Sequence, residues 1–272
     1  MQGPLKKMPA VLNEHQTAQY QLALGDRKIE LNELVGNELY LNFSGNIFCT
    51  HCGKKTKKSY SQGHCFVCMR KLASCDMCIL KPETCHFARG TCREPKWGEA
   101  NCFVDHYVYL SNTSGVKVGI TRHTQLPTRW IDQGATQALP VFKVKSRLIS
   151  GLLETALAKF VTDKTQWQAM LKGNNENLDL HLLAQELCDK VQPTLDSLNA
   201  EYGDDSWLRV DQQPVTINYP VQRFPTKVKS FNLDKTPQIG GILEGIKGQY
   251  LIFDTGVINV RKYGSYEVSV SL

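Results

Sequence analysis

The stretch CTHCGKKTKKSYSQGHCFVC, residues 49–68, decides how this chain folds. It holds two Cys-x2-Cys pairs, Cys49 with Cys52 and Cys65 with Cys68, separated by twelve residues. Two such turns can bring four thiolates to the corners of one tetrahedron, about 2.3 Å from a central ion, which is the closed geometry of structural Zn²⁺. Because paired Cys-x2-Cys turns are a strong signal, we predict a zinc site with these four ligands.

A second group of cysteines follows and predicts a second metal site. Its members are Cys75, Cys78, Cys85, Cys92 and Cys102. The first four form the most compact set, so we predict that they hold a second Zn²⁺ and that Cys102 is spare. An iron–sulfur cluster uses the same thiolate ligands and stays open as the alternative. His86 and His106 are further candidate ligands.

Disulfide bonding, the other explanation for clustered cysteines, conflicts with the compartment that the sequence indicates. The first ten residues lack the apolar stretch and cleavage site of a secretory signal. No run approaches the ~18 consecutive apolar residues of a membrane span. We therefore expect a cytoplasmic protein without a membrane partner, where disulfides are rare. Cys188 stands alone in a helical pattern and is expected to be a small core residue.

The positive charge of the chain is concentrated in the cysteine-rich part. Residues 43–97 carry ten Lys or Arg against three acidic residues, a net charge of +7, whereas the whole chain carries +6. Four lysines lie between the two Cys-x2-Cys pairs, namely Lys54, Lys55, Lys57 and Lys58. Lysines beside Tyr60 suit the phosphates and bases of DNA or RNA. Alternatively, the lysines only offset the negative charge of zinc ions bound by thiolates. The excess of seven positive charges is larger than two such centres would need.

Hydrophobic periodicity predicts an α+β fold with four parts. They are an N-terminal β segment (1–48), a cysteine-rich zinc-binding region (49–103), an α/β core with helices (104–205) and a β-rich C-terminal domain (206–272). Residues 19–48 alternate polar and apolar side chains, which indicates short antiparallel strands. Short β runs after Trp207, including 227–231, predict a small barrel or sheet. It is either a separate oligonucleotide-binding barrel or a set of strands completing the preceding core.

The third part shows a strand, a turn, a strand and then helices. Residues 107–110 and 116–121 are β runs on either side of a turn, so they predict a hairpin. Residues 147–161 have the apolar spacing of an amphipathic helix. A second helix is predicted over 178–198, where Pro193 is expected to kink or end it.

This hairpin and helix resemble the core of the GIY-YIG endonucleases over residues 104–168. The tripeptides YVY (107–109) and KVG (117–119) are similar to the two short motifs on the opening strands of that family's sheet. Arg129 and Glu154 follow in the order of the family's arginine and helix-borne glutamate. The regions on either side of this core are similar to a prokaryotic family of unknown function.

The resemblance implies a metal-dependent endonuclease, a hydrolase acting on phosphodiester bonds. It assigns Glu154 to a catalytic Mg²⁺ or Mn²⁺ ion and Arg129 to the scissile phosphate. Tyr109 would serve as the general base or orient the attacking water. Lys117 replaces the second motif's tyrosine; it can neutralise phosphate, but it acts as a base only if burial lowers its pKa.

Two further departures from the family pattern concern proton transfer and phosphate binding. Gln133 stands where the family has a histidine or tyrosine, and an amide cannot transfer protons. Arg122 and His123 lie near the second strand and are candidate substitutes, Arg122 as a nucleic-acid-binding residue. The competing interpretation is therefore a non-catalytic DNA- or RNA-binding module built on a diverged nuclease core.

Overall fold

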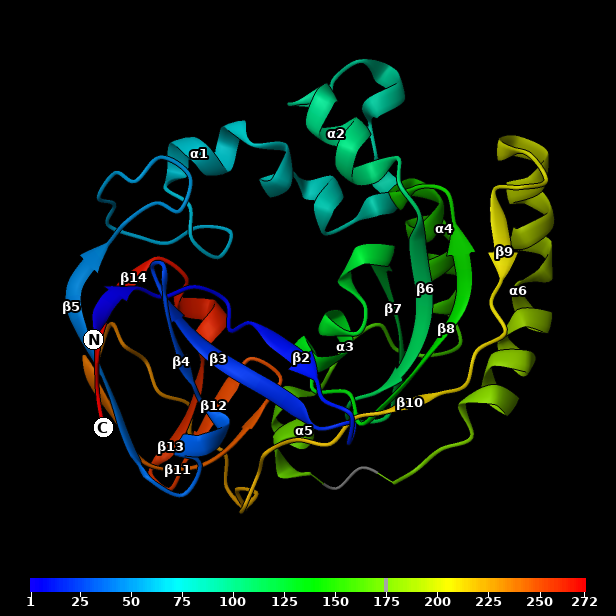
Figure 1. Cartoon of the computed structure of the whole chain (residues 1–272). Helices are drawn as coiled ribbons and strands as arrows, with labels where there is room; N and C mark the ends of the chain where they lie inside the picture. Colours follow the sequence, from blue (N-terminus) through cyan, green and yellow to red (C-terminus); the bar gives the residue numbers. More distant parts are fainter. Residues whose placement is uncertain (174–175) are drawn as a thin grey trace.

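The computed structural model describes residues 1–173 and 176–272 and confirms the α+β class. Within this part of the chain, the strands form three sheets (Figure 1). The terminal sheet contains both ends of the chain, the core sheet carries the hairpin, and a small meander lies beside them. The meander consists of β2 (Ala10–Leu12), β3 (Ala18–Leu24) and β4 (Arg27–Glu30).

The terminal sheet joins strands from the first and last parts of the sequence. Its order is β1 (Gln2–Pro4), β14 (Tyr266–Ser271), β5 (Glu38–Ile47), β11 (Gln238–Lys247), β12 (Tyr250–Phe253) and β13 (Gly256–Asn259). Leu41 in β5 pairs with Val270 on one side and Ile239 on the other, and all three side chains are buried. The C-terminal β runs therefore complete an open sheet that begins in the N-terminal segment, and the described strands form no closed barrel.

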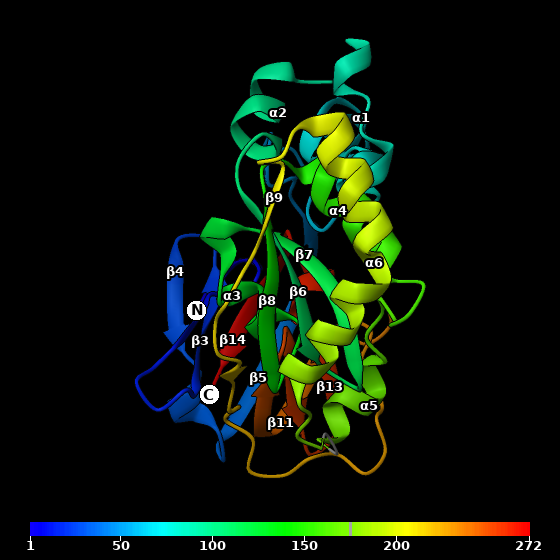
Figure 2. The ribbon, with the colours of Figure 1, turned by 90° about the vertical axis from the view of Figure 1, so that its right-hand side faces the viewer.

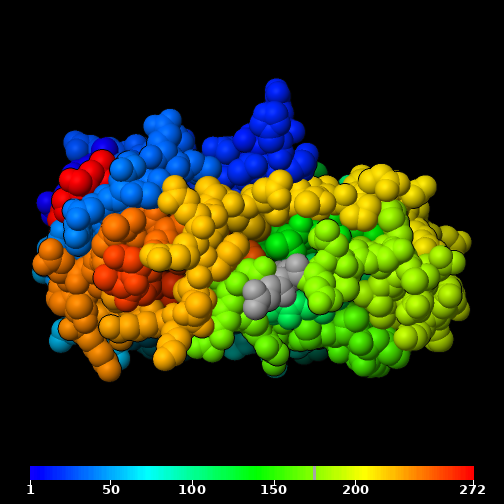
Figure 3. All heavy atoms as spheres, turned by 90° about the horizontal axis from the view of Figure 1, so that it is seen from below, coloured from blue at the N-terminus to red at the C-terminus, as the bar shows by residue number. Residues whose placement is uncertain are grey.

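The core sheet contains the predicted hairpin. Its order is β10 (Val215–Thr216), β8 (Gln137–Val144), β6 (His106–Asn112) and β7 (Val116–Arg122), with β9 (Trp207–Arg209) also paired to β8. The β6–β7 register places Tyr109 opposite Gly119. The segment after β10, gold to orange in Figure 3, crosses the surface from the core sheet to the terminal sheet.

Two helices cover one face of the core sheet, and the terminal sheet packs toward the other. They are α4 (Arg147–Leu157) and α6 (Leu180–Tyr202), and Figure 2 shows α6 in front of the strands of the core sheet. Leu153 of α4 and Leu187 of α6 share a hydrophobic cluster with Val108 of the sheet. Tyr109, which points the other way along β6, belongs to the cluster that fills the terminal sheet. The alternation of side chains along β6 thus places Tyr109 between the two sheets.

Two of the predicted elements differ in detail. Pro193, expected to kink or end the second helix, does not end α6, which continues to Tyr202. Pro193 is exposed, so the Asp189 carbonyl that loses its helical hydrogen bond can be solvated. Residues 227–231 do not form a strand; Ser230 makes a single bridge to Val257.

The cysteine-rich region runs across the top of the molecule in Figure 1, from the end of β5 to the start of β6. Its short helices are α1 (Phe66–Lys71) and α2 (Pro95–Cys102), with 3₁₀ turns between them. No residue between 49 and 102, all of which the structure describes, belongs to a hydrophobic core cluster. The region therefore depends on something other than apolar packing for its shape.

Helix α4 is the main contact between this region and the core sheet. Arg147 at its start donates from Nη2 to the carbonyl of Ile79 at 2.6 Å. Gly151, one turn later, lies against the 3₁₀ turn η4 (Pro82–Thr84). A Cβ atom at position 151 would lie 2.6 Å from Cβ of Pro82 and 2.7 Å from the backbone nitrogen of Glu83.

The remaining helices are short, and none is a candidate membrane span. They are α3 (Thr128–Asp132) and α5 (Trp167–Lys172). Among the helices formed by residues 1–173 and 176–272, none is both long and apolar enough to cross a membrane.

We expect Gly151→Ala to destabilise the protein by about 1–3 kcal/mol because the new methyl group meets backbone atoms that cannot move aside. A Gly→Ala change in an ordinary helix stabilises the protein by about 0.5–1 kcal/mol. The sign of the change in unfolding free energy therefore tests the contact. Urea unfolding measures the difference. Thr155→Ala, on the exposed side of the same helix, is the control and should change stability by less than about 0.5 kcal/mol. A Gly151→Ala variant at least as stable as the wild type would contradict the packing.

Candidate functional site

The four cysteines of residues 49–68 come together as predicted. Their sulfur atoms lie within 4.8 Å of one another, with Cys52 and Cys65 at 3.9 Å. A tetrahedron with bonds of about 2.3 Å has edges of about 3.8 Å, so the spacing fits one ion. The first pair lies on a turn closed by a hydrogen bond from Gly53 N to Cys49 O (2.8 Å). The second pair opens α1, where the Cys65 sulfur accepts from Cys68 N at 3.4 Å.

The charges within this cluster favour a bound cation. Burial opposes ionisation of Cys49, but backbone N–H groups of Cys52 and Cys65 lower its pKa to about 6. Burial and the neighbouring thiols raise the pKa of Cys68 to about 12. One ionised thiolate therefore opposes ionisation of the neighbouring thiols. A divalent ion bound to all four sulfur atoms removes this repulsion. The cluster can hold a structural metal such as zinc.

The second cysteine group is arranged differently from the predicted set. Four thiols line one small cavity of about 20 Å³, and they belong to Cys78, Cys85, Cys92 and Cys102. Cys75 does not line it. Ligand atoms of Asp76, Cys78 and His86 also lie within 4.8 Å of one another. Cys102, expected to be spare, lines this cavity, whereas Cys75, expected to be a ligand, does not.

The lysine-rich loop is exposed beside two aromatic rings. Its lysines Lys54, Lys55, Lys57 and Lys58 all face solvent. The rings of Tyr60 and Phe66 pack edge to face, with centroids 5.6 Å apart, and Phe66 is 50% exposed. Arg70 lies over the Phe66 ring at 5.8 Å. Cations and accessible rings are therefore adjacent on one surface.

Tyr109, Lys117, Arg129 and Glu154 come together around the β6–β7 hairpin. Tyr109 is fully buried, and a Cβ atom on Gly119 would lie only 2.7 Å from its hydroxyl oxygen. The KVG tripeptide therefore needs its glycine to leave room for the tyrosine on the opposite strand. Burial raises the pKa of Tyr109, although the Arg129 guanidinium opposes this.

Gln133 connects Tyr109 to Arg129. With its amide oxygen facing the guanidinium, Gln133 accepts from Arg129 Nη2 at 3.2 Å and from Nε at 3.3 Å. Its amide nitrogen then donates to the Tyr109 hydroxyl at 2.8 Å. The orientation is the one that satisfies both partners. Gln133 transfers no proton, but it orients the arginine and the tyrosine.

Lys117, which is buried, and Glu154, which is partly buried, form an electrostatically coupled pair of titratable groups. Lys117 is 5% exposed, and burial, together with Arg129, lowers its pKa to about 8. Burial raises the pKa of Glu154 to about 7, and the charge of Lys117 opposes that rise. Asp163 also acts on both groups. Perturbed groups of this kind concentrate at functional sites.

More cations surround this pair than the motifs indicated. Arg147 interacts electrostatically with Arg122 and Arg129 and with Glu154. Arg122 also donates to the side chain of Asn101. Sequence reasoning missed Arg147 and Asp163; Arg147 is the first residue of the predicted helix, which was the available signal. The excess of cations over carboxylates makes the site suited to an anion.

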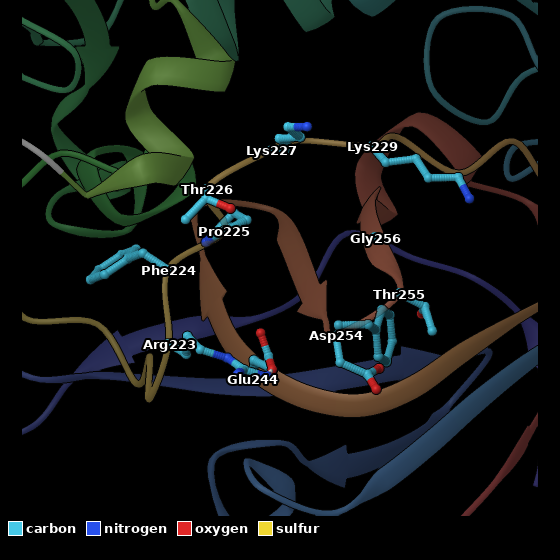
Figure 4. Close-up of a pocket in the computed structure, with 11 residues that line it drawn as sticks. Arg223, Phe224, Pro225, Thr226, Lys227, Lys229, Glu244, Asp254, Thr255 and Gly256 are labelled. Atoms are coloured by element: carbon cyan, nitrogen blue, oxygen red, sulfur yellow. Dashed lines mark hydrogen bonds and ion pairs between the residues drawn. The ribbon is translucent and has the colours of Figure 1, made fainter.

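A separate hollow lies at the edge of the terminal sheet and contains none of the predicted site residues. It has a volume of about 390 Å³ and is shown in Figure 4. Arg223 forms an ion pair with Glu244 across it, and Asp254 accepts from the backbone nitrogen of Ile242 at 3.0 Å. Both of its acidic side chains are already engaged within the protein, which makes the hollow a weaker candidate for binding a cation than the site around the β6–β7 hairpin (the hairpin site).

Fold and site together define an α+β protein with a four-cysteine cluster able to hold a structural metal. Residues 36–268 match the model of a family described as "protein of unknown function (DUF2797)", and the chain belongs to this family. The prediction of a family of unknown function is thereby confirmed. No curated protein and no solved structure matches the chain.

We expect Cys49→Ser to remove one metal equivalent per chain and to destabilise residues 49–68, because metal binding and folding are coupled in such sites. Elemental analysis of native and variant protein measures the change. Cys188→Ser is the control, because Cys188 lies in the core cluster of α6 far along the chain; its metal content should equal that of the wild type. Native protein with less than one metal ion per chain would contradict the prediction.

Proposed function

We propose that this protein binds DNA or RNA and hydrolyses phosphodiester bonds at a site formed by Tyr109, Lys117, Arg129 and Glu154. One observation carries the proposal. A buried lysine with a pKa of about 8 lies near a partly buried glutamate with a pKa of about 7, beside an arginine. These residues follow the order of the GIY-YIG motifs, and their proximity supports that resemblance.

Lys117 takes the role of general base in this proposal. Its pKa of about 8 leaves roughly a tenth of the amine neutral at pH 7, ready to accept a proton from water. Tyr109 suits this role less, because burial raises its pKa and its hydroxyl is engaged by Gln133. Tyr109 and Gln133 instead hold Arg129, which binds the scissile phosphate.

Glu154 is the residue that would hold a divalent ion, Mg²⁺ or Mn²⁺. Burial raises its pKa to about 7 in the absence of a metal, and a bound cation would favour the ionised carboxylate. The ion would neutralise charge that develops on the phosphate and the leaving oxygen. Asp163 is close enough to act on Glu154 and is a candidate outer partner of the ion.

The lysine-rich loop supplies nucleic-acid affinity in this proposal. Its four exposed lysines neutralise phosphates, while Tyr60 and Phe66 offer rings to unpaired bases. Structural zinc bound by the four cysteines of residues 49–68 fixes both ends of the loop. Arg122 extends the basic surface toward the hairpin site.

One observation favours a second candidate, a binding module without catalysis. The hydroxyl of Tyr109 is buried and hydrogen-bonded to an amide, so neither residue moves protons. If Lys117 stays protonated when a polyanion binds, the same cations hold a phosphate and no bond is cleaved.

Glu154→Gln separates the two candidates. The amide cannot hold a divalent ion as a carboxylate does, so we expect metal-dependent cleavage to fall at least about 100-fold while binding changes less than about threefold. Cleavage of a panel of DNA and RNA substrates with Mg²⁺ or Mn²⁺ measures the first, and fluorescence anisotropy the second. Glu186→Gln, exposed on α6, is the control. A wild type that cuts no member of the panel supports the binding module.

The pH dependence of cleavage tests Lys117. Lys117 accepts a proton only when neutral, so the rate should rise with pH through about 8 and then level off. Lys117→Met should lack this rise and lose most activity. It should still fold, because it removes a buried charge and keeps an unbranched apolar side chain. A Lys117→Met variant that keeps the wild-type pH profile would exclude Lys117 as the base.

Replacing Lys54, Lys55, Lys57 and Lys58 with serine should weaken nucleic-acid binding and reduce its salt dependence. Each lost phosphate contact lowers the slope of log K against log salt by about 0.9 in duplex DNA, so four contacts give roughly 3–4. The control removes the same charge elsewhere by changing exposed Lys28, Lys159, Lys190 and Lys235 to serine. Equal effects of the two variants would show that net charge, and not this loop, determines affinity.

A further inference from the structure

The second half of the cysteine-rich region has few apolar contacts to hold its shape. Between Leu72 and Cys102, 3₁₀ turns follow one another before α2 begins. Ala73 and Pro82 are the buried apolar side chains of this described stretch, and large side chains such as Met77 and Leu80 are exposed. The first cysteine cluster ends at Cys68 and cannot restrain residues up to 34 positions further on. A stretch of this composition needs a covalent or metal cross-link.

Four thiols face the interior of exactly this stretch, and together they surround one small space. Cys78, Cys85, Cys92 and Cys102 all line the cavity of about 20 Å³. A Cβ atom on Gly98 would lie 3.2 Å from the Phe87 ring and 3.4 Å from the Cys92 sulfur. Gly98 therefore leaves room for both side chains on the cavity wall, and Cys75 does not line the cavity.

We propose that Cys78, Cys85, Cys92 and Cys102 bind a second metal centre through four thiolates, with Cys75 excluded from the ligand set. The proposal goes beyond the nuclease site, because it concerns a centre at which no substrate acts. It also replaces the ligand set predicted from the sequence, which included Cys75, with the four cysteines that line the cavity. Spacings of six, six and nine residues between the four ligands let the chain wrap around the centre.

The spacing of the thiols distinguishes this centre from the first one. Sulfur atoms of Cys49, Cys52, Cys65 and Cys68 all lie within 4.8 Å of one another. Among the described residues, no three of the four second-site thiols meet that limit together. A four-iron cluster holds its thiolates further apart than a single ion does, because each thiolate binds a different iron atom. A single ion and a cluster share this ligand chemistry, and metal analysis distinguishes them.

The centre is connected to the elements that carry the proposed nuclease site. Asn101, next to the ligand Cys102, accepts from Arg122 at the end of β7. Arg147 at the start of α4 donates to the carbonyl of Ile79, next to the ligand Cys78. Lys117 lies on β7 and Glu154 on α4. A metal at the second centre therefore positions both elements, while it touches no reacting atom.

Metal analysis of the full-length protein tests the proposal. Protein purified without oxygen is assayed for zinc, iron and acid-labile sulfide per chain. We expect one zinc for the first cluster and, in addition, either iron with matching sulfide and visible absorption or a second zinc. Iron with matching sulfide identifies an iron–sulfur cluster, and a second zinc identifies a single ion. Either result supports a second metal centre. A wild type with one metal ion per chain and no iron would overturn it.

Three variants test the ligand set. Cys85→Ser and Cys102→Ser should lose the second centre and keep the first zinc, which also shows that the rest of the protein has folded. Cys75→Ser is the matched control, three residues from the ligand Cys78, and should keep both centres. Loss of metal from Cys75→Ser with full retention in Cys102→Ser would overturn the assignment. The wild-type stoichiometry decides the existence of the centre even if a variant fails to fold.

Discussion

The structure depends most on the clustering of cysteine thiols in residues 49–102, a region without a hydrophobic core. Residues 49–102 link the terminal sheet to the core sheet, yet they contribute nothing to the apolar clusters of the molecule. Metal–thiolate bonds suit this task because a few ligands fix a short loop as firmly as many apolar contacts would. If the cysteines hold a metal, the shape of residues 49–102 and the position of α4 depend on it.

A second constraint lies in the core sheet, where charged side chains are buried between apolar layers. Burial lowers the pKa of Lys117 and raises that of Glu154, so both charged forms are disfavoured near neutral pH. For Glu154 this costs stability as the pH rises from its ordinary value of about 4.5 through 7; for Lys117 it costs stability as the pH falls from about 10.5 through 8. Hydrophobic residues would be more stable there. A fold that keeps such groups in one place usually does so for chemistry.

These two constraints meet at α4. Its N-terminal arginine bonds to the cysteine-rich region, its glycine lets that region approach, and its glutamate faces the hairpin site. Helix α4 thus connects the cysteine-rich region to the titratable pair. The lysine-rich loop is at the other end of the same region, where α1 begins. The loop and the titratable pair are consequently linked through a single stretch of chain, although they lie far apart in it.

The sequence by itself determined the features that depend on local spacing. Paired Cys-x2-Cys turns specify one tetrahedron, a two-residue period with a turn specifies the β6–β7 hairpin, and the apolar stripe from Arg147 specifies α4. Tertiary structure alone decided the rest. The pairing of β5 with β11 and β14, the choice of Cys102 over Cys75 beside the cavity, and the burial of Lys117 all depend on contacts between distant residues. The exposure of Pro193, which lets α6 continue, depends on the same packing. Short-range sequence patterns determine which helix or strand forms. Only the packing of these elements against one another determines which side chains are buried and which thiols lie close together.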